Sequence, residues 1–444
     1  MIFIKFGSMN ELELLAPAGT IEKMHYAFAF GADAVYAGQP QFSLRARENG
    51  FQTVEDVAYG IEYAHNLGKK FYLASNIIPH NNKINSFTKA LDQIIEVKPD
   101  ALIMTDPGMI HYVRQNHPDQ EVHLSVQGNC TNWSTAKFWY DMGVKRIILS
   151  RELRLREIIE IHDKVPEVEL EVFVHGAVCM AHSGRCLLSN YMSMRDSNQG
   201  ACSNACRFNY SLYAGNEPQG GDQYVPLEGE FFLEEQKTPG DMIPIDEDEY
   251  GTYIMNSKDM CAIAVLDQLA EAGVVSFKIE GRTKSQYYLS QVCKSYRGAI
   301  DDVLAGRPIA QEHINNAHKT EGRGFFPGFF VPERQIPQNY EATRVQSETG
   351  SVVGIVRGWD TETSEAIIDV KGKFETGDQV EVSMPKSSEV ISASEMRNHK
   401  GKPTDVLNSG VDKCRIKLDA DPGEYAFLVK RHDLVKELET AVKA

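Results

Sequence analysis

The sequence predicts an α/β protein: a TIM-like (β/α)8 barrel followed by a small C-terminal antiparallel β-barrel domain. Three observations predict this fold. Eight short apolar runs alternate with helix-length amphipathic segments over the first 280 residues, and a cysteine-bearing insertion follows the seventh run. Beyond residue 350, short β-branched segments alternate with turns. Strands that alternate with helices form parallel sheets with helical crossovers, and eight of them can close a barrel.

The eight predicted barrel strands are residues 13–16, 34–37, 71–74, 101–104, 122–126, 146–149, 170–174 and 276–279. Helices are predicted at 22–31, 54–68, 84–97, 134–143 and 152–163, with a last one at 259–272 before strand eight. Gly31, Gly68 and Gly143 mark three helix ends, where glycine accepts the left-handed conformation. A doubly wound open sheet is the alternative. No Gly-x-Gly-x-x-Gly motif follows the first strand, which weakens the dinucleotide-binding version of that alternative.

The domain boundaries follow from these patterns. Residues 9–330 are predicted to form the barrel, with residues 178–250 as an insertion after strand seven. Residues 331–347 are a predicted linker, and residues 348–435 the β-barrel domain, with strands at 352–356, 366–370, 379–382, 415–418 and 425–429. This second domain is expected to bind or dock a partner, or to act as a structural cap.

Composition narrows the classes of function. The chain carries 62 acidic against 46 basic side chains, a net charge of −16, so that RNA contact would require a local basic surface. No apolar run reaches the roughly 18 residues of a membrane span, and no secretory signal is evident. A cytoplasmic protein without membrane partners is expected. In a reducing compartment, clustered cysteines indicate metal binding or catalysis rather than disulfides.

Four cysteines cluster in the insertion: Cys179, Cys186, Cys202 and Cys206. They fall within 28 residues, and Gly184 and Gly200 allow the chain between them to bend. Four thiolates suit structural zinc or an iron–sulfur cluster and exclude magnesium or calcium. The spacing differs from the paired C-x2-C of a zinc ribbon. A metal centre is therefore predicted on this insertion.

Four further cysteines lie outside this cluster. Cys130, Cys293 and Cys414 are scattered along the chain, as buried thiols are. Cys261 is interpreted as a packed thiol that begins the last barrel helix.

Polar side chains gather where the predicted strands end. Because a (β/α)8 barrel carries its chemistry at the carboxyl ends of its strands, these side chains define a candidate site. They are Asn76, Asp106, Gln127, Asn129, Arg151, Glu152, His175, Lys278, Glu280 and Arg282. Any one of them has an alternative role in loop capping, but as a set they indicate a site.

Several motifs together resemble a known family. Glu171-x-Phe173-x-x-Gly176-Ala177-Val178-Cys179-x4-Gly184-x-Cys186 is similar to the signature of the collagenase-like peptidases of unknown catalytic type. Leu14-Leu15-Ala16-Pro17-Ala18-Gly19 and Lys278-Ile279-Glu280-Gly281-Arg282 resemble the two ends of that family's barrel. With Cys202-x-Asn204-Ala205-Cys206-Arg207, the chain is most similar to the RNA-hydroxylating branch. The resemblance covers nearly the whole chain.

This resemblance implies oxygen-independent, prephenate-dependent hydroxylation of the wobble uridine of tRNA to 5-hydroxyuridine. It implies an iron–sulfur cluster, of the [4Fe–4S] type, on Cys179, Cys186, Cys202 and Cys206, with zinc as the alternative metal. The implied partners are tRNA, prephenate, and an electron donor or cluster-assembly proteins.

Roles for the remaining candidate residues follow from this implied chemistry. The predicted catalytic residues are Asp106, His175, Lys278 and Glu280, with Asp106 and Glu280 as proton-transfer groups. Arginines clamp carboxylates in pairs of hydrogen bonds, and amides read the edge of a splayed-out base. The predicted substrate-binding residues are Arg45, Arg47, Asn76, Gln127, Asn129, Arg151, Arg282 and Lys284.

Two other functions stay open. A collagenase-like peptidase would need an activated nucleophile or an open zinc site, yet the chain holds neither His-Glu-x-x-His nor Gly-x-Ser-x-Gly. An RNA-binding protein with a structural zinc would use the β-domain without performing chemistry.

Overall fold

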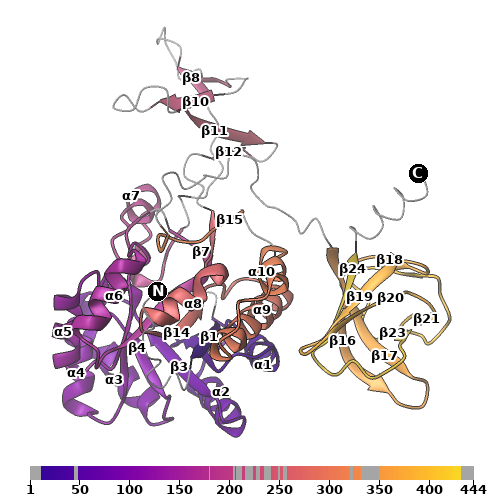
Figure 1. The fold of residues 1–444 in the computed structure, drawn as a ribbon, viewed down its shortest axis with the longest axis horizontal. Helices are drawn as coiled ribbons and strands as arrows, with labels where there is room; N and C mark the ends of the chain where they lie inside the picture. Colours follow the sequence, from indigo (N-terminus) through magenta and orange to yellow (C-terminus); the bar gives the residue numbers. More distant parts are fainter. Residues whose placement is uncertain are drawn as a thin grey trace.

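The computed structural model describes residues 12–44, 49–179, 181–203, 206, 213–215, 224–226, 231–234, 242–248, 251–253, 258–320, 324–331 and 350–431. Its N-terminal part is a closed barrel ringed by helices, and a separate β-domain follows (Figure 1). Among the helices within these ranges, none combines the length and apolar character that a membrane span requires.

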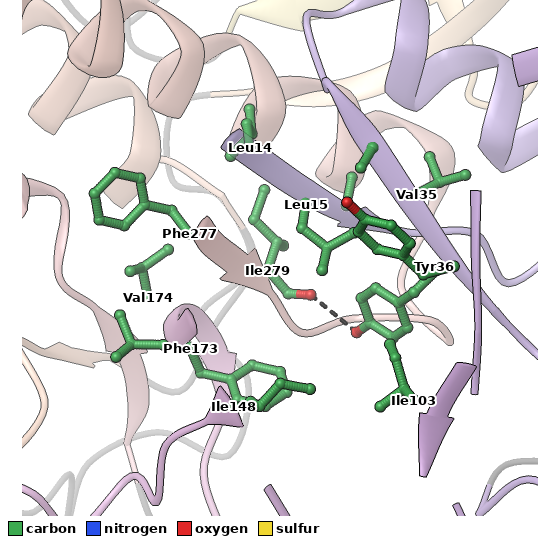
Figure 2. Packing of buried hydrophobic residues seen from close by; sticks show 14 of the residues in the cluster. Leu14, Leu15, Val35, Tyr36, Ile103, Ile148, Phe173, Val174, Phe277 and Ile279 are labelled. Atoms are coloured by element: carbon green, nitrogen blue, oxygen red, sulfur yellow. Dashed lines mark hydrogen bonds between the residues drawn. The ribbon is translucent and has the colours of Figure 1, made fainter. Parts of the chain in front are cut away.

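Eight parallel strands close the barrel. They are β1 (Glu13–Pro17), β2 (Ala34–Gly38), β3 (Lys70–Ser75), β4 (Ala101–Met104), β5 (Val122–Leu124), β6 (Arg146–Ile148), β7 (Glu169–Ala177) and β14 (Val274–Ile279). Each strand pairs with the next, and β14 pairs with both β7 and β1. The predicted (β/α)8 barrel is confirmed, and the open-sheet alternative is excluded. Figure 2 shows the packed interior, where the Tyr36 hydroxyl donates to the Ile279 carbonyl across the closure.

The outer helices begin at side-chain caps that the sequence provides. Thr20 precedes α1 (Ile21–Ala29), and Thr53 forms a capping box with Asp56 before α2 (Val54–Asn66). Ser285 caps α9 (Gln286–Leu304), the longest helix among the described residues. The other outer helices are α3 (Ile84–Ile95), α4 (Pro107–Asn116), α5 (Trp133–Asp141), α6 (Leu155–Lys164), α8 (Leu266–Glu271) and α10 (Gln311–His318).

The predicted helix at 259–272 is wrong in its first part. Residues Asp259–Cys261 form strand β13, which pairs antiparallel with the end of β7, and α8 begins only at Leu266. Strand β15 (Phe325–Phe326) extends this edge by pairing with β13. Cys261 is therefore a buried strand residue rather than the start of a helix.

The insertion after β7 lies over the barrel (Figure 1). Its described residues include the short helix α7 (Leu188–Ser193) and strands β8 (Tyr213–Gly215), β9 (Tyr224–Pro226), β10 (Phe231–Glu234), β11 (Met242–Asp248) and β12 (Gly251–Tyr253). Figure 1 shows β8, β10, β11 and β12 above α7. Strands β10, β11 and β12 form one antiparallel sheet, and β8 pairs with β9.

The C-terminal domain is an antiparallel sheet, as predicted. Its strands are β16 (Gly350–Asp360), β17 (Glu365–Val370), β18 (Phe374–Glu375), β19 (Gln379–Ser383), β20 (Ser388–Ser392), β21 (Met396–Arg397), β22 (Val406–Leu407), β23 (Cys414–Lys417) and β24 (Phe427–Arg431). Seven of them follow the order β20-β19-β24-β16-β17-β23-β21, and β18 pairs with β22.

The two domains contact each other through aromatic side chains. Tyr26 of α1 packs against Phe427 and Tyr425, with ring centroids 5.0 and 5.3 Å apart. An ion pair of 2.7 Å joins Arg357 to Glu22 beside these rings. The β-domain is thus docked on the helical outside of the barrel.

Candidate functional site at the carboxyl end of the barrel

A column of charged side chains fills the lower barrel interior. Arg146 of β6 contacts Glu13 of β1, and its Nε lies 2.9 Å from Glu169. Tyr72 donates a 2.6 Å hydrogen bond to Glu13. Burial by itself would raise the pKa of Glu13, but Arg146 and Tyr72 lower it to about 2. Glu13 is therefore a carboxylate at neutral pH.

Glu171 of β7 links this column to the upper interior. One carboxylate oxygen lies 3.4 Å from Arg146, and the other accepts a 2.8 Å hydrogen bond from Lys278 Nζ. Glu171 and Lys278 are both almost completely buried. Burial lowers the pKa of Lys278, although the Glu171 carboxylate acts in the opposite direction. The pair places one ammonium in the middle of the barrel, below its carboxyl end.

Above Glu171, Lys278 and two arginines lie against two aromatic rings. Lys278 Nζ lies 4.2 Å from the ring centre of Tyr36, and Arg282 approaches the same ring at 5.9 Å. Arg151 lies over the ring of Phe173 at 4.0 Å. Cations over aromatic faces are stabilised by the ring quadrupole. Three positive groups from β14, its following loop and the loop after β6 thus surround one small region.

The carboxylate of Glu280 balances part of this charge. It lies 3.8 Å from Arg151, which also donates a 3.1 Å hydrogen bond to the Ala177 carbonyl. The arrangement can bind an anionic ligand in bidentate fashion and offers one carboxylate for proton transfer. The structure therefore brings Arg151, Lys278, Glu280 and Arg282 together, as the strand-end pattern predicts.

Amides line the neighbouring strand ends. Asn76 accepts a hydrogen bond from Leu44 N and donates one of 3.3 Å to the Ser125 hydroxyl. Asn129, whose backbone is in the left-handed conformation, accepts a 2.8 Å hydrogen bond from the Ser150 hydroxyl. Gln127 lies half-buried beside them. Asn76 and Asn129 thus brace the loops after β3, β5 and β6.

The positions of Asp106 and His175 do not support the catalytic roles predicted for them. Asp106 caps α4, accepting a 3.0 Å hydrogen bond from Met109 N. His175 is fully buried beside Tyr296 and Phe325, where burial lowers its pKa to about 3. The register between β7 and β14 shifts after Lys278, which pairs with Phe173 while Ile279 pairs with His175. This irregularity reverses the alternation, so that His175 packs against the outer helix α9.

Lys284, also predicted to bind the substrate, lies elsewhere. Lys284 is directed to the outer side, with Nζ 3.9 Å from Asp259 and 4.9 Å from the ring centre of Tyr288. Arg45 and Arg47 lie outside the described residues, and their predicted role stays a prediction.

The cysteine-bearing insertion is packed onto the mouth of the barrel. A Cβ on Gly184 would lie 2.2 Å from the Gln127 carbonyl oxygen, so the chain approaches closely there. The backbone N–H of Ser183 donates a 2.9 Å hydrogen bond to the carboxylate of Glu152, which lies in the loop after β6. The N–H of Ile78, in the loop that follows β3, donates a 3.1 Å hydrogen bond to the Asn198 carbonyl of the insertion. The insertion therefore covers the strand ends that carry the candidate site.

The four clustered cysteines all belong to this cover. None of the eight cysteines forms a disulfide, and thiols on loops are suitable ligands for iron–sulfur clusters or zinc. Across the described part of the chain, however, no three His, Cys, Asp or Glu side chains gather as a metal site. The four thiols nevertheless fit a cluster in their chemistry, because thiolates are the usual protein ligands of iron–sulfur clusters.

Sequence reasoning did not identify Glu13, Arg146 and Glu171 as partners of the site. A signal was present, because a charged residue inside an otherwise apolar barrel strand must find a buried partner. Glu171 between Leu170 and Val172 is such a residue. Which partner it meets depends on strand register, which a single sequence does not show.

A closed parallel barrel with ionic groups at the carboxyl ends of its strands defines a (β/α)8-barrel protein with a polar site at its mouth. The sequence profile of peptidase family U32 matches residues 19–339, and that of the U32 C-terminal domain matches residues 348–429. The chain belongs to peptidase family U32.

Its relatives have informative names. The tRNA hydroxylation protein P of Escherichia coli is 47% identical over 412 residues, 88% of this chain and 90% of that protein. Its counterpart from Haemophilus influenzae is 45% identical, over 89% of this chain and 90% of that protein. The 23S rRNA 5-hydroxycytidine C2501 synthase of Escherichia coli is 32% identical over 74% of this chain and 44% of its own length. A solved U32 peptidase is 12% identical over 63% of this chain and 96% of its own, with a TM-score of 0.37.

Proposed function

We propose that this protein hydroxylates a uridine of tRNA. One observation carries the proposal: relatives 45 and 47% identical, aligned over about nine tenths of their length, are named tRNA hydroxylation proteins. A more distant relative is named a synthase of 5-hydroxycytidine in ribosomal RNA. The shared chemistry is the addition of a hydroxyl group to a pyrimidine of RNA. The proposed product is 5-hydroxyuridine at the wobble position.

The charges at the mouth of the barrel support an anionic co-substrate. Prephenate, which carries two carboxylates, is the co-substrate we propose. Arg151 and Arg282 present planar guanidinium groups, and Lys278 adds a point charge between them and Glu171. The uridine would lie above these groups, where Gln127, Asn76 and Asn129 offer amide groups to its edge. Glu280 is the proposed proton-transfer group, because its carboxylate faces Arg151 at the mouth.

We further propose an iron–sulfur cluster on Cys179, Cys186, Cys202 and Cys206. Its support is a set of four thiols, none of them in a disulfide, on a segment that covers the barrel mouth. Such a cluster supplies one-electron chemistry when bound, and an electron donor would then be a partner. Anaerobic purification followed by iron, sulfide and zinc analysis tests this part. Zinc at one equivalent, without iron, would replace the cluster by a structural metal.

The function itself is tested in a strain that lacks the gene, grown without oxygen so that oxygen-requiring routes are inactive. Nucleosides from its total tRNA are measured by mass spectrometry. Loss of 5-hydroxyuridine and its derivatives is expected, with recovery when the gene is restored. Unchanged 5-hydroxyuridine would contradict the proposal.

A further inference from the structure

Helix α7 of the insertion presents apolar side chains to solvent. Leu187 is 68% exposed, Tyr191 83% and Met194 88%. Tyr191 N donates to the Leu187 carbonyl, so these residues are one helical turn apart and lie on one face. Met194 follows three residues after Tyr191, at the left-handed end of the helix. We call Leu187, Tyr191 and Met194 the α7 stripe.

The opposite face of α7 is polar and buried. The Ser189 hydroxyl donates a 2.6 Å hydrogen bond to the Arg195 carbonyl. It also accepts hydrogen bonds from the Ser203 backbone N–H, at 2.9 Å, and from the Ser203 hydroxyl. The Ser197 hydroxyl donates a 3.1 Å hydrogen bond to the Cys186 carbonyl. These bonds fix the orientation of the helix, so the outward direction of the α7 stripe is set by the fold. An apolar stripe held in water in this way is typical of a binding surface.

Charge next to the α7 stripe selects the kind of partner. The exposed Arg185 and Arg195 precede and follow it in the chain, and neither forms an ion pair with another described residue. The neighbouring Asp196 carboxylate is engaged by Asn198 N at 2.8 Å. In a chain with a net charge of −16, this is a locally basic surface around an exposed aromatic ring. Guanidinium groups beside an exposed aromatic ring suit unpaired nucleotides, with phosphates on the arginines and a base on the ring.

We propose that the α7 stripe is a stacking platform for the unpaired bases of the RNA loop whose pyrimidine enters the barrel. Tyr191 stacks on a base next to the modified nucleotide, and Arg185 and Arg195 contact the adjoining phosphates. The insertion that carries α7 is fixed to the strand ends through Ser183, Gly184 and Asn198. The platform therefore stands beside the mouth that the base must enter. This inference rests on the proposed function, because it assigns the recognition surface for that substrate.

The experiment compares the binding of an unmodified tRNA transcript with that of a fully paired hairpin closed by a stable tetraloop. Loss of one base–aromatic stacking interaction weakens binding by about 5- to 100-fold in Kd. Tyr191→Ala is expected to weaken tRNA binding by such a factor and to leave hairpin binding unchanged, whereas Tyr191→Phe retains the wild-type Kd. Phe138→Ala is the matched control, because Phe138 is 54% exposed on the outer helix α5.

Equal Kd values for tRNA in the wild-type protein and Tyr191→Ala would overturn the platform, as would an equal loss for tRNA and hairpin. A tRNA Kd unchanged by Tyr191→Ala, together with loss of a co-purifying protein, would assign the α7 stripe to a protein partner and also overturn it. Failure of the proposed function is distinguishable, since it shows as 5-hydroxyuridine that persists in the deletion strain whatever Tyr191 does in vitro.

Discussion

Lys278 shows how a single side chain connects the stability of the barrel to its proposed chemistry. Its ammonium lies inside the barrel, bonded to Glu171 at 2.8 Å and directed at the ring of Tyr36. A buried charge is tolerated only when its partner is present, because desolvation otherwise exceeds any gain. The same ammonium faces the layer where an anionic ligand would bind.

Lys278→Met should destabilise the protein by about 3 kcal/mol, because the Glu171 carboxylate then lacks its closest cation. Urea denaturation at neutral pH measures this loss. The double variant Glu171→Gln/Lys278→Met should recover part of it, since neither charge is left alone. Lys137→Met, which removes an exposed pair with Asp141, is the control and should leave the urea midpoint close to that of the wild type. A Lys278→Met protein as stable as the wild type would contradict the role of the pair.

The lowered pKa of Glu13 makes the free energy of unfolding depend on pH in the acidic range. Its pKa is about 2 in the folded state, below the ordinary value of 4.5 for a glutamate, so its contribution to stability is complete above about pH 4.5 and is lost as the pH falls toward 2. Glu13→Gln should reduce stability at pH 7 by about 3 kcal/mol and flatten the decline between pH 4.5 and 2. Urea midpoints measured across this range test the prediction. An unchanged slope in the variant would show that Glu13 is not the titrating group.

At the scale of elements, the sequence predicted the strands better than the irregular parts. The eight barrel strands were found because each is a short apolar run between helix-length segments. Strand β13 was missed because the predicted helix was begun at residue 259, whereas pairing of Met260 with Gly176 decides the local structure. The placement of His175 failed because a register shift between β7 and β14 cannot be read from one strand. Arg151, Lys278 and Glu280 were found because strand ends converge in any barrel of this type.

Close contact between the insertion and the barrel predicts the effect of Gly184→Ala. Gly184 has a φ of +73°, and its added Cβ would lie 2.2 Å from the Gln127 carbonyl oxygen. The insertion must then separate from the mouth, so we expect tRNA hydroxylation to fall at least about tenfold with the barrel still folded. Gly401→Ala is the control, because Gly401 has a φ of +75° but nothing within 4 Å of the added atom. Equal hydroxylation by the two variants would contradict the contact.

At the scale of the whole molecule, the docked β-domain limits where RNA can approach. Phe427 contacts Tyr26, Phe30 and Tyr287 of the barrel helices, so the domain lies against the outer layer rather than over the strand ends. The acidic average of the chain, −16, makes the cations at the mouth and beside α7 the local exceptions. Because the β-domain lies on the outer helices and the cations lie at the mouth and beside α7, we expect RNA to approach from the side of the insertion.

The interface between the domains gives a further prediction. Phe427→Ala should loosen the docking, because it removes a fully buried ring shared with Tyr26 and Tyr287, at a cost of about 3 kcal/mol. Small-angle X-ray scattering should then show a larger radius of gyration. Phe374→Ala, which removes a buried ring from the core of the β-domain itself, should leave that radius unchanged while the protein is folded. The same radius for Phe427→Ala and the wild type would contradict the docking.

The central claim is that the mouth of this barrel hydroxylates tRNA. Its most direct test restores the gene as Arg151→Met in the deletion strain grown without oxygen, with Lys137→Met as control. Arg151 lies over Phe173 and beside Glu280 at the mouth, whereas Lys137 is exposed on α5. Mass spectrometry should find 5-hydroxyuridine restored by the wild type and by Lys137→Met, and reduced at least about tenfold with Arg151→Met. Full restoration by Arg151→Met, at equal protein level, would contradict the account.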